Sequence, residues 1–189
     1  SHIDSVPNGG FYDGTLGVMA GLEALMATKE AGIKLKRPLW LINFSCEESS
    51  RFKTATIGSK IISGKLSQQR LHELKDEDGI SLFEAMSAAG FKPQNLDEAI
   101  LKENSLHAYL ELHIEQGPVL ERSAISVGVV SGIAAPIRFE ITIQGKADHS
   151  GATPMNMRSD ALLAASHIII AANKFAKNKK TAVATVGYV

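Results

Sequence analysis

Side chains that bind divalent metals are scattered along this chain in short polar motifs. The candidate ligands are two histidines, His2 and His113, the aspartate Asp13, and one of the adjacent glutamates Glu47 and Glu48. Imidazole and carboxylate groups together form ligand sets that zinc, manganese, cobalt and nickel accept. The other glutamate of that pair could take a proton from a water that a metal has made acidic. These residue types could bind a divalent metal and activate a water bound to it.

The two motifs nearest the start supply a histidine and two aspartates. His2 and Asp4 lie two residues apart, and on a strand this spacing puts both side chains on one face. The Asp4 carboxylate could then accept one ring N–H of His2 and leave the other nitrogen for a metal, although His-x-Asp also occurs by chance. Asp13 lies in a Gly-Gly-x-x-Asp-Gly turn, where its oxygens could face two cations. The alternative is an aspartate that caps the helix starting at Thr15.

Two adjacent glutamates, Glu47 and Glu48, follow a short apolar run at residues 39–44. Burying two like charges is unfavourable unless a cation or a proton compensates. Beside a metal, one glutamate could serve as a ligand and the other could transfer protons. The alternative is a solvated pair in a loop, one member of which Arg51 could neutralise.

Three candidates lie in the second half of the chain. His113 ends a predicted strand and would complete one metal shell with His2 and Asp13, unless it is a structural histidine. Gln116 could contact a polar group of a substrate, or simply cap the residues that follow it. His149, in an Ala-Asp-His-Ser-Gly turn, could donate a hydrogen bond to a developing oxyanion. A plain turn histidine is the alternative for His149.

Composition argues against several other classes of function. Twenty basic and twenty acidic residues give a formal net charge of zero, which offers no support for a nucleic-acid or anionic membrane partner. The sequence holds no apolar run long enough to span a bilayer. The single cysteine, Cys46, allows no internal disulfide and fits a reducing, cytoplasmic setting. The first residue is not methionine and the last nine residues resemble a strand, so we expect both ends to be internal to a longer protein.

Apolar periodicity predicts an α/β fold that positions these motifs. Helices are expected at residues 15–32, 82–89, 96–101 and 155–177, and strands at residues 39–44, 106–114, 125–133, 137–143 and 181–189. A change of pattern at residues 134–136 divides a first unit that carries the candidate ligands, residues 1–134, from a second, truncated α+β unit, residues 135–189. In open α/β sheets, ligands bind at the carboxyl ends of strands, where Glu47 and Glu48 are expected.

Together the motifs resemble the amidase, hydantoinase and carbamoylase branch of the dinuclear metal aminoacylase and carboxypeptidase superfamily. The most specific stretches are Glu-Leu-His-Ile-Glu-Gln-Gly-Pro at residues 111–118 and Asp-His-Ser-Gly-Ala-Thr-Pro-Met at residues 148–155. This family includes N-carbamoyl-L-amino-acid hydrolases, allantoate amidohydrolases and β-ureidopropionases. The resemblance implies an incomplete zinc-peptidase-like catalytic domain, with a central mixed sheet flanked by helices, and part of a smaller lid and dimerisation domain.

The resemblance also implies two divalent metal ions. His2, Asp13 and His113 would hold one ion, and Asp13 would bridge to a second ion that Glu48 also binds. Zinc is the first expectation, with manganese, cobalt and nickel as alternatives. The family takes a last histidine ligand from a C-terminal segment that these residues do not include, so the second ion is expected to bind weakly or not at all. Ser49 stands where the family usually has glycine and leaves the ligands in place.

Other motif residues receive catalytic and substrate-binding roles from the same resemblance. Glu47 would be the general base and Asp4 would support His2. Gln116 would contact the substrate. His149 would reach from the lid toward the reacting carbonyl, usually across a dimer. Arg158 matches a family motif, but the resemblance gives it no individual role.

The implied reaction is hydrolysis of the ureido C–N bond of an N-carbamoyl-L-amino acid or of allantoate, with release of ammonia and carbon dioxide. An aminoacylase or a dipeptidase of the same superfamily is the alternative enzyme. A further alternative is a catalytically incompetent piece that only binds or dimerises, because these residues alone are expected to have little or no activity. The expected partners are a small ureido substrate and a second copy of the chain.

Overall fold

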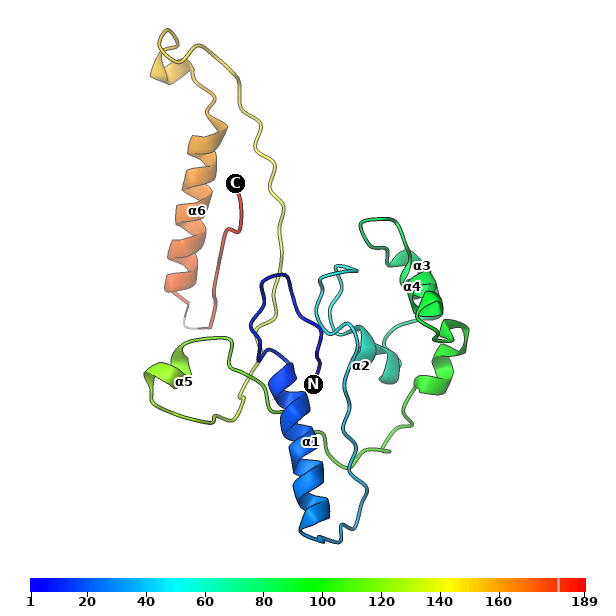
Figure 1. The fold of residues 1–189 in the computed structure, drawn as a ribbon. Helices are drawn as coiled ribbons and strands as arrows, with labels where there is room; N and C mark the ends of the chain where they lie inside the picture. The colour runs from blue at the N-terminus through cyan, green and yellow to red at the C-terminus, as the bar shows by residue number, and fades with distance from the viewer. Residues whose placement is uncertain (180) are drawn as a thin grey trace. The chain divides into compact units, whose positions relative to one another are not determined.

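Helices are the regular secondary structure of this protein (Figure 1). The computed structural model describes residues 1–179 and 181–189. The helices within these residues are α1 (Thr15–Glu30), α2 (Ile57–Ile62), α3 (Gln68–Glu73), α4 (Leu82–Ala88), η1 (Pro93–Ala99), α5 (Val119–Arg122), η2 (Met155–Met157) and α6 (Ala161–Lys177). Over the same residues, every helix is too short or too polar to cross a membrane.

The chain divides into two compact units, residues 1–129 and residues 130–189. This division falls five residues before the boundary that the sequence indicates at residue 134. The assignment of the two parts to catalysis and to a lid stays a prediction.

Helix α1 confirms the helix predicted after Asp13. It runs from Thr15 to Glu30, and the chain leaves it through Gly32, whose φ of +63° is the left-handed conformation that glycine adopts readily. Gly17 lets this helix lie directly against residues of the site, because a Cβ there would be 2.3 Å from the carbonyl oxygen of Leu112. The glycine at position 17 therefore allows α1 to pack closely beside the residue that precedes His113.

Residues 52–101, called here the helical segment, contain the buried apolar core of the first unit. Helices α3, α4 and η1 pack against one another, and α2 packs on η1. The buried side chains are Phe52, Ile57, Leu66, Leu71, Leu74, Leu82 and Leu96. Two predicted helices fall in this segment: 82–89 is confirmed as α4, whereas 96–101 is a 3₁₀ helix that starts earlier, at Pro93.

A reciprocal capping box starts α4. The Ser81 hydroxyl accepts the amide of Glu84 at 3.2 Å, and the Glu84 carboxylate accepts the amide of Ser81 at 2.8 Å. These bonds satisfy two backbone donors that have no partner inside the helix. They also lower the pKa of the Glu84 carboxyl, because the hydrogen bonds from Ser81 favour its charged form.

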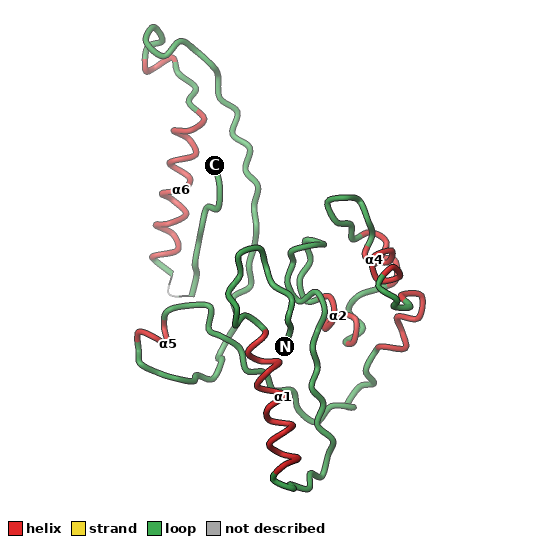
Figure 2. Tube along the Cα trace, in the orientation of Figure 1, coloured by secondary structure: helices red, strands yellow, loops and turns green. Residues whose placement is uncertain are grey.

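The five predicted strands are not formed as strands within the described residues, and Figure 2 shows these stretches as loop. The bridges found there are a parallel one between His2 and Phe44 and an antiparallel one between Lys75 and Ser81. The predicted central mixed sheet is therefore not confirmed. The physical reason is that a strand needs a hydrogen-bonded neighbour, and these runs find none over their length. Many of their apolar side chains stay exposed; Leu110, for example, is 96% exposed.

The second unit holds the longest helix, α6. It begins at Ala161 rather than at residue 155, because the Asp160 carboxylate accepts the amide of Leu163 at 3.0 Å and caps the helix there. Residues 155–157 form the separate 3₁₀ turn η2. The long helix predicted for residues 155–177 is thus correct in its end and wrong in its start.

Candidate metal centre

His2 is a buried ligand candidate whose ring orientation is fixed. It is 2% exposed, and the ring packs on Gly14, where a Cβ would lie 2.4 Å from Cε1. Nδ1 lies 2.9 Å from the carbonyl oxygen of Asp4. Because a carbonyl only accepts, Nδ1 must carry the proton. Nε2 is left with a free lone pair, as metal-binding histidines require.

Asp13 brings two imidazoles toward one carboxylate oxygen. Its Oδ1 lies 3.3 Å from Nε2 of His113 and 3.9 Å from Nε2 of His2. The second histidine has the same tautomer as the first, because its Nδ1 contacts the carbonyl oxygen of Ile114 at 2.9 Å. Oδ1 of Asp13 is buried, with no hydrogen-bond partner among the residues that the structure describes.

An unsatisfied buried carboxylate oxygen between two imidazole lone pairs is unfavourable unless a cation joins them. Ligand atoms of His2, Asp13 and His113 all lie within 4.8 Å of one another. One carboxylate and two neutral imidazoles are a donor set that divalent transition metals accept. These three residues therefore fit a divalent ion.

A second group of possible ligands adjoins the first through His2. It consists of His2, Glu47 and Glu48, again with ligand atoms within 4.8 Å of one another. Partial burial and the negative charges of Glu47 and Asp13 raise the pKa of the Glu48 carboxyl. A bound cation would relieve this repulsion, because it favours the charged form of each carboxylate.

The side chain of Asp4 contacts the glutamate pair rather than the ring of His2. Its carboxylate accepts the backbone amides of Glu47 at 3.2 Å and Glu48 at 2.9 Å, and it lies 3.8 Å from Nδ1 of His2. The expected support of His2 comes instead from the Asp4 main-chain carbonyl. One aspartate thus links the first ligand to the loop that carries both glutamates.

The start of α2 holds the same loop from the other side. Three consecutive amides donate to three consecutive carbonyls that end at Glu47: Thr56 to Glu47 at 2.6 Å, Ile57 to Cys46 at 2.9 Å and Gly58 to Ser45 at 3.1 Å. Cys46 and Thr56 both have positive φ values, +52° and +59°, which bend the chain into this arrangement. Burial raises the pKa of the Cys46 thiol, in keeping with a structural cysteine.

Arg51 does not neutralise the glutamate pair, as one interpretation of the sequence suggested. Its guanidinium donates to the Asp76 carboxylate, with Nε and Nη2 each 3.0 Å from Oδ2. Arg51 therefore ties the loop after Glu48 to the helical segment, and the charges of Glu47 and Glu48 remain available to a cation.

Gln116 lies at the metal centre in a position that the sequence did not predict. Its side-chain amide donates to Oδ2 of Asp13 at 2.7 Å, and its φ is +56°. Glu115 fixes this turn, because its carboxylate accepts the amides of Val119 and Leu120 at the start of α5. Contact between Gln116 and a substrate remains a prediction.

Tyr109 and Glu111 lie beside the centre, and neither received a role in the sequence analysis. The Tyr109 hydroxyl donates to Glu111 at 2.7 Å, and although partial burial opposes it, this bond lowers the pKa of the Glu111 carboxyl. Burial and the negative charge of Glu111 raise the pKa of Tyr109. The signal was available, because residues 109, 111 and 113 alternate along an extended run and share one face.

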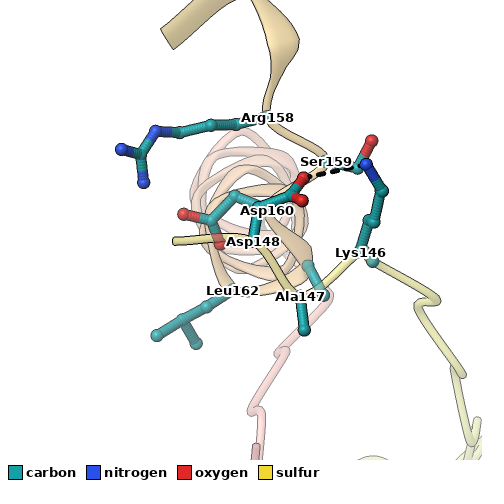
Figure 3. A pocket seen from close by; sticks show the side chains of 9 residues that line it. Lys146, Ala147, Asp148, Arg158, Ser159, Asp160 and Leu162 are labelled. Carbon is teal, nitrogen blue, oxygen red and sulfur yellow. Dashed lines mark ion pairs between the residues drawn. The ribbon is translucent and has the colours of Figure 1, made fainter. Parts of the chain in front are cut away.

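His149 and Arg158 belong to the second unit, whereas all the candidate metal ligands belong to the first. The ring of His149 lies in a turn at residues 149–153. A hollow of about 430 Å³ nearby is lined by residues 145–148 and 158–162 (Figure 3). Lys146 and Asp148 form an ion pair at 3.2 Å on its wall. None of the predicted metal ligands lines this hollow.

Comparison with known proteins matches nearly the whole chain. An N-carbamoyl-L-amino acid amidohydrolase from Geobacillus stearothermophilus is 46% identical over 187 residues, 99% of this chain and 46% of that protein. An allantoate amidohydrolase from Bacillus subtilis is 41% identical over 169 residues, 89% of this chain and 40% of that protein. The crystal structure of a hydantoinase/carbamoylase family amidase from Burkholderia ambifaria superposes with a TM-score of 0.75 at 32% identity, over 100% of this chain and 45% of that one.

The chain spans about half the length of the curated relatives it matches. The model of one family, described as Peptidase family M20/M25/M40, matches residues 1–187. These residues include both groups of clustered histidines and carboxylates around His2. Because the match covers almost every residue, the chain belongs to Peptidase family M20/M25/M40.

Proposed function

We propose that this chain is part of a metal-dependent amidohydrolase that cleaves the ureido C–N bond of an N-carbamoyl-L-amino acid or of allantoate. The observation that carries the proposal is the buried Oδ1 of Asp13, which lies without a hydrogen-bond partner among the described residues between Nε2 of His2 and Nε2 of His113. The names of the amidohydrolase relatives support the choice of substrate class.

The residues that would hold metal are those already in place. His2, Asp13 and His113 would bind one ion, and Glu48 with Asp13 would bind part of a second. Zinc is the first candidate and manganese, cobalt and nickel are alternatives, because all accept imidazole and carboxylate ligands. A divalent ion, when bound, polarises the substrate carbonyl and makes water more acidic.

Glu47 would move the proton. Its Oε2 lies 3.6 Å from Nε2 of His2, and its side chain is 33% exposed, so both the metal ligands and solvent are within its reach. It would take the proton of the attacking water and deliver it to the leaving nitrogen. Asp4 holds the backbone of this residue through the amide contact, so the base keeps its position relative to His2.

Other features of the whole protein belong to the same proposal. His149 would donate a hydrogen bond to the carbonyl oxygen of the substrate, and Gln116 would contact the substrate after releasing Asp13. Residues 1–134 would belong to the catalytic domain and residues 135–189 to the lid. The exposed apolar runs would become strands of a central mixed sheet by pairing with the remainder of the longer protein. A homodimer in a cytoplasmic setting fits the single cysteine and the exposed apolar side chains.

The test uses the full-length protein and four substrate classes. Ammonia release should be seen with an N-carbamoyl-L-amino acid or allantoate, should stop with a chelator and should return with added zinc or manganese. Cleavage of only N-acetyl-amino acids or dipeptides would overturn the ureido assignment and favour an aminoacylase or a peptidase.

The metal site has its own test in Asp13→Asn. Changing a residue that merely supports a metal ligand weakens metal affinity by about 10- to 100-fold, so losing a ligand should weaken it at least as much. Metal content measured by mass spectrometry after dialysis should fall, and Asp78→Asn, in an exposed turn of the helical segment, should retain the wild-type content. Unchanged metal content in Asp13→Asn would contradict the proposed site.

A further inference from the structure

The turn at residues 149–153 surrounds one nitrogen of the His149 ring. The backbone amides of Gly151 and Ala152 both donate to Nδ1, each at 3.1 Å. A nitrogen that accepts two N–H groups presents its lone pair and carries no proton. The proton of the neutral ring must then be on Nε2, which makes Nε2 a hydrogen-bond donor.

Asp148, the residue before His149, does not bond to Nδ1 of the ring, although the Asp-His pair in the sequence suggests such a bond. The Asp148 carboxylate is taken by Lys146 at 3.2 Å on the wall of the hollow (Figure 3). Backbone amides therefore occupy the place where a carboxylate would favour a proton on Nδ1. The tautomer of His149 is set by the shape of its own turn.

Arg158 holds the opposite side of the same turn. Its Nε and Nη2 donate to the carbonyl oxygen of Thr153 at 3.1 and 2.8 Å, and Nη2 also donates to the carbonyl oxygen of Ser150. The turn is closed by the amide of Thr153, which donates to the carbonyl oxygen of His149 at 3.2 Å. One guanidinium thus joins the two carbonyls that flank the amides on the ring.

The link from Arg158 to the ring passes through a single peptide plane. The Ser150 carbonyl and the Gly151 amide belong to the same planar trans unit, so they point in opposite directions. When the guanidinium holds the carbonyl, the amide is aimed at Nδ1 of His149. A positive charge on the carbonyl also polarises the amide and makes it a stronger donor.

We propose that Arg158 is a positioning residue that fixes His149 as an Nε2–H donor through the Ser150–Gly151 peptide. This inference rests on the proposed function, in which that N–H meets the carbonyl oxygen of the substrate. A donor that already points outward needs no reorientation as negative charge develops on that oxygen. Arg158 would thereby act on the reaction without contacting the substrate.

The test compares tautomers in the full-length protein. Nitrogen-15 labelling of histidine, with His149→Gln to assign the signal, reports which ring nitrogen of His149 carries the proton. In the wild type, Nδ1 should be the unprotonated nitrogen. In Arg158→Met, the signals should move toward a mixture of both tautomers. Arg158→Lys keeps one positive charge without the fork that spans two carbonyls, so it should fall between.

A kinetic readout accompanies the spectra. Removing an oxyanion donor outright lowers kcat by about 10²- to 10³-fold, so a donor that is only misdirected should lower kcat by about 10-fold in Arg158→Met. KM should change little, because the interaction strengthens as the reaction proceeds. Arg138→Met, which changes an exposed arginine of the same unit, is the matched control and should leave spectra and rates unchanged.

Two results would overturn the proposal. One is an unprotonated Nδ1 in Arg158→Met that matches the wild type. The other is unfolding of both Arg158 variants, detected by circular dichroism, because it would make Arg158 a purely structural residue. If the tautomer changes as expected but no ureido compound is cleaved, the proposed function fails and the positioning of His149 by Arg158 still stands.

Discussion

The helical segment, residues 52–101, buries its apolar side chains, whereas the extended run at residues 106–114 exposes its own. Leu71 on α3 is 0% exposed and Leu110 is 96% exposed, although both are leucines of one compact unit. A helix satisfies its backbone internally and needs only an apolar face to pack. A strand needs a neighbour for every backbone bond, and that neighbour is usually distant in sequence. The comparison separates structure that a short stretch can build alone from structure that depends on the rest of a protein.

The metal centre lies where these two kinds of structure meet. His2 is buried even though it belongs to an extended run, because the parallel bridge to Phe44 and the close approach of Gly14 enclose it. Glu47 and Glu48 are held at the edge of the helical segment by the start of α2. The start of α2 and the distant Asp4 together hold the two glutamates, and residues distant in sequence enclose His2.

The largest effect expected from this comparison follows truncation of a core leucine. Leu71→Ala should lower the free energy of unfolding by about 2–5 kcal/mol, because it leaves a cavity among buried side chains. Leu110→Ala in the same chain should change it by less than about 0.5 kcal/mol, as for other exposed substitutions. Urea unfolding followed by circular dichroism measures both. Equal losses in the two variants would show that the extended run is packed in solution and would break the comparison.

A middle-sized effect is expected at the start of α4. Ser81→Ala removes the hydroxyl that caps the helix and should lower the free energy of unfolding by about 1 kcal/mol. Ser123→Ala, at the exposed end of α5, provides the control. Ser123 ends that helix through its backbone amide, which the substitution leaves in place. Thermal unfolding of the three proteins should rank Ser81→Ala lowest. A Ser81→Ala protein as stable as the wild type would mean that packing alone fixes α4.

The smallest expected effect is a change in how the free energy of unfolding depends on pH, caused by Asp76 in the helical segment. Burial works to raise the pKa of Asp76, but bonds from the amides of Ile80 and Asp78 and from Arg51 outweigh it and lower the pKa. A carboxyl with a lowered folded-state pKa stabilises the fold above its ordinary value of about 3.9, and this contribution is lost as the pH falls through the lower folded value. Asp76→Asn should therefore destabilise at neutral pH and approach the wild type in acid.

Unfolding free energies measured from pH 7 down to pH 3 test this expectation. Arg51→Met should flatten the same pH dependence to a smaller degree, because it removes one partner of Asp76 and leaves the two amides. Parallel curves for the wild type and Asp76→Asn would show that the ion pair adds no stability to the segment.

The sequence predicted those parts of the fold whose signals are local. Helix α1 was found from its apolar spacing and from Gly32, and α4 from its apolar run and Gly90. The start of α6 was placed too early, although the capping aspartate Asp160 is visible in the sequence. The strands were recognised as apolar runs, but a run cannot specify the partner that would make it a strand.

The clustering of three candidate ligands was predictable from the sequence, whereas the contacts around them were not. His2, Asp13 and His113 come together as expected, because residue type and order identify them. The amide contacts of Asp4 with the glutamate pair and the bond from Gln116 to Asp13 depend on backbone turns that spacing does not encode. Left-handed residues other than glycine make such turns, and they leave little trace in a single sequence.

The end of the helical segment bonds back to the first helix of the same segment, α2, which in turn bonds to the loop of Glu47. The amides at the start of α2 bond to the carbonyls that end at Glu47, and the amide of Leu101 bonds to the carbonyl of Ile62 at 2.8 Å. Lengthening a closed loop of this kind destabilises the fold only slightly, because the entropic cost of closing a loop grows slowly with its length. The exposed turn at Gly79 could therefore accept a grafted peptide, such as an affinity tag or a fluorescent reporter, with no shift of Glu47. This gives protein engineers an attachment point that stays clear of Glu47 and Glu48.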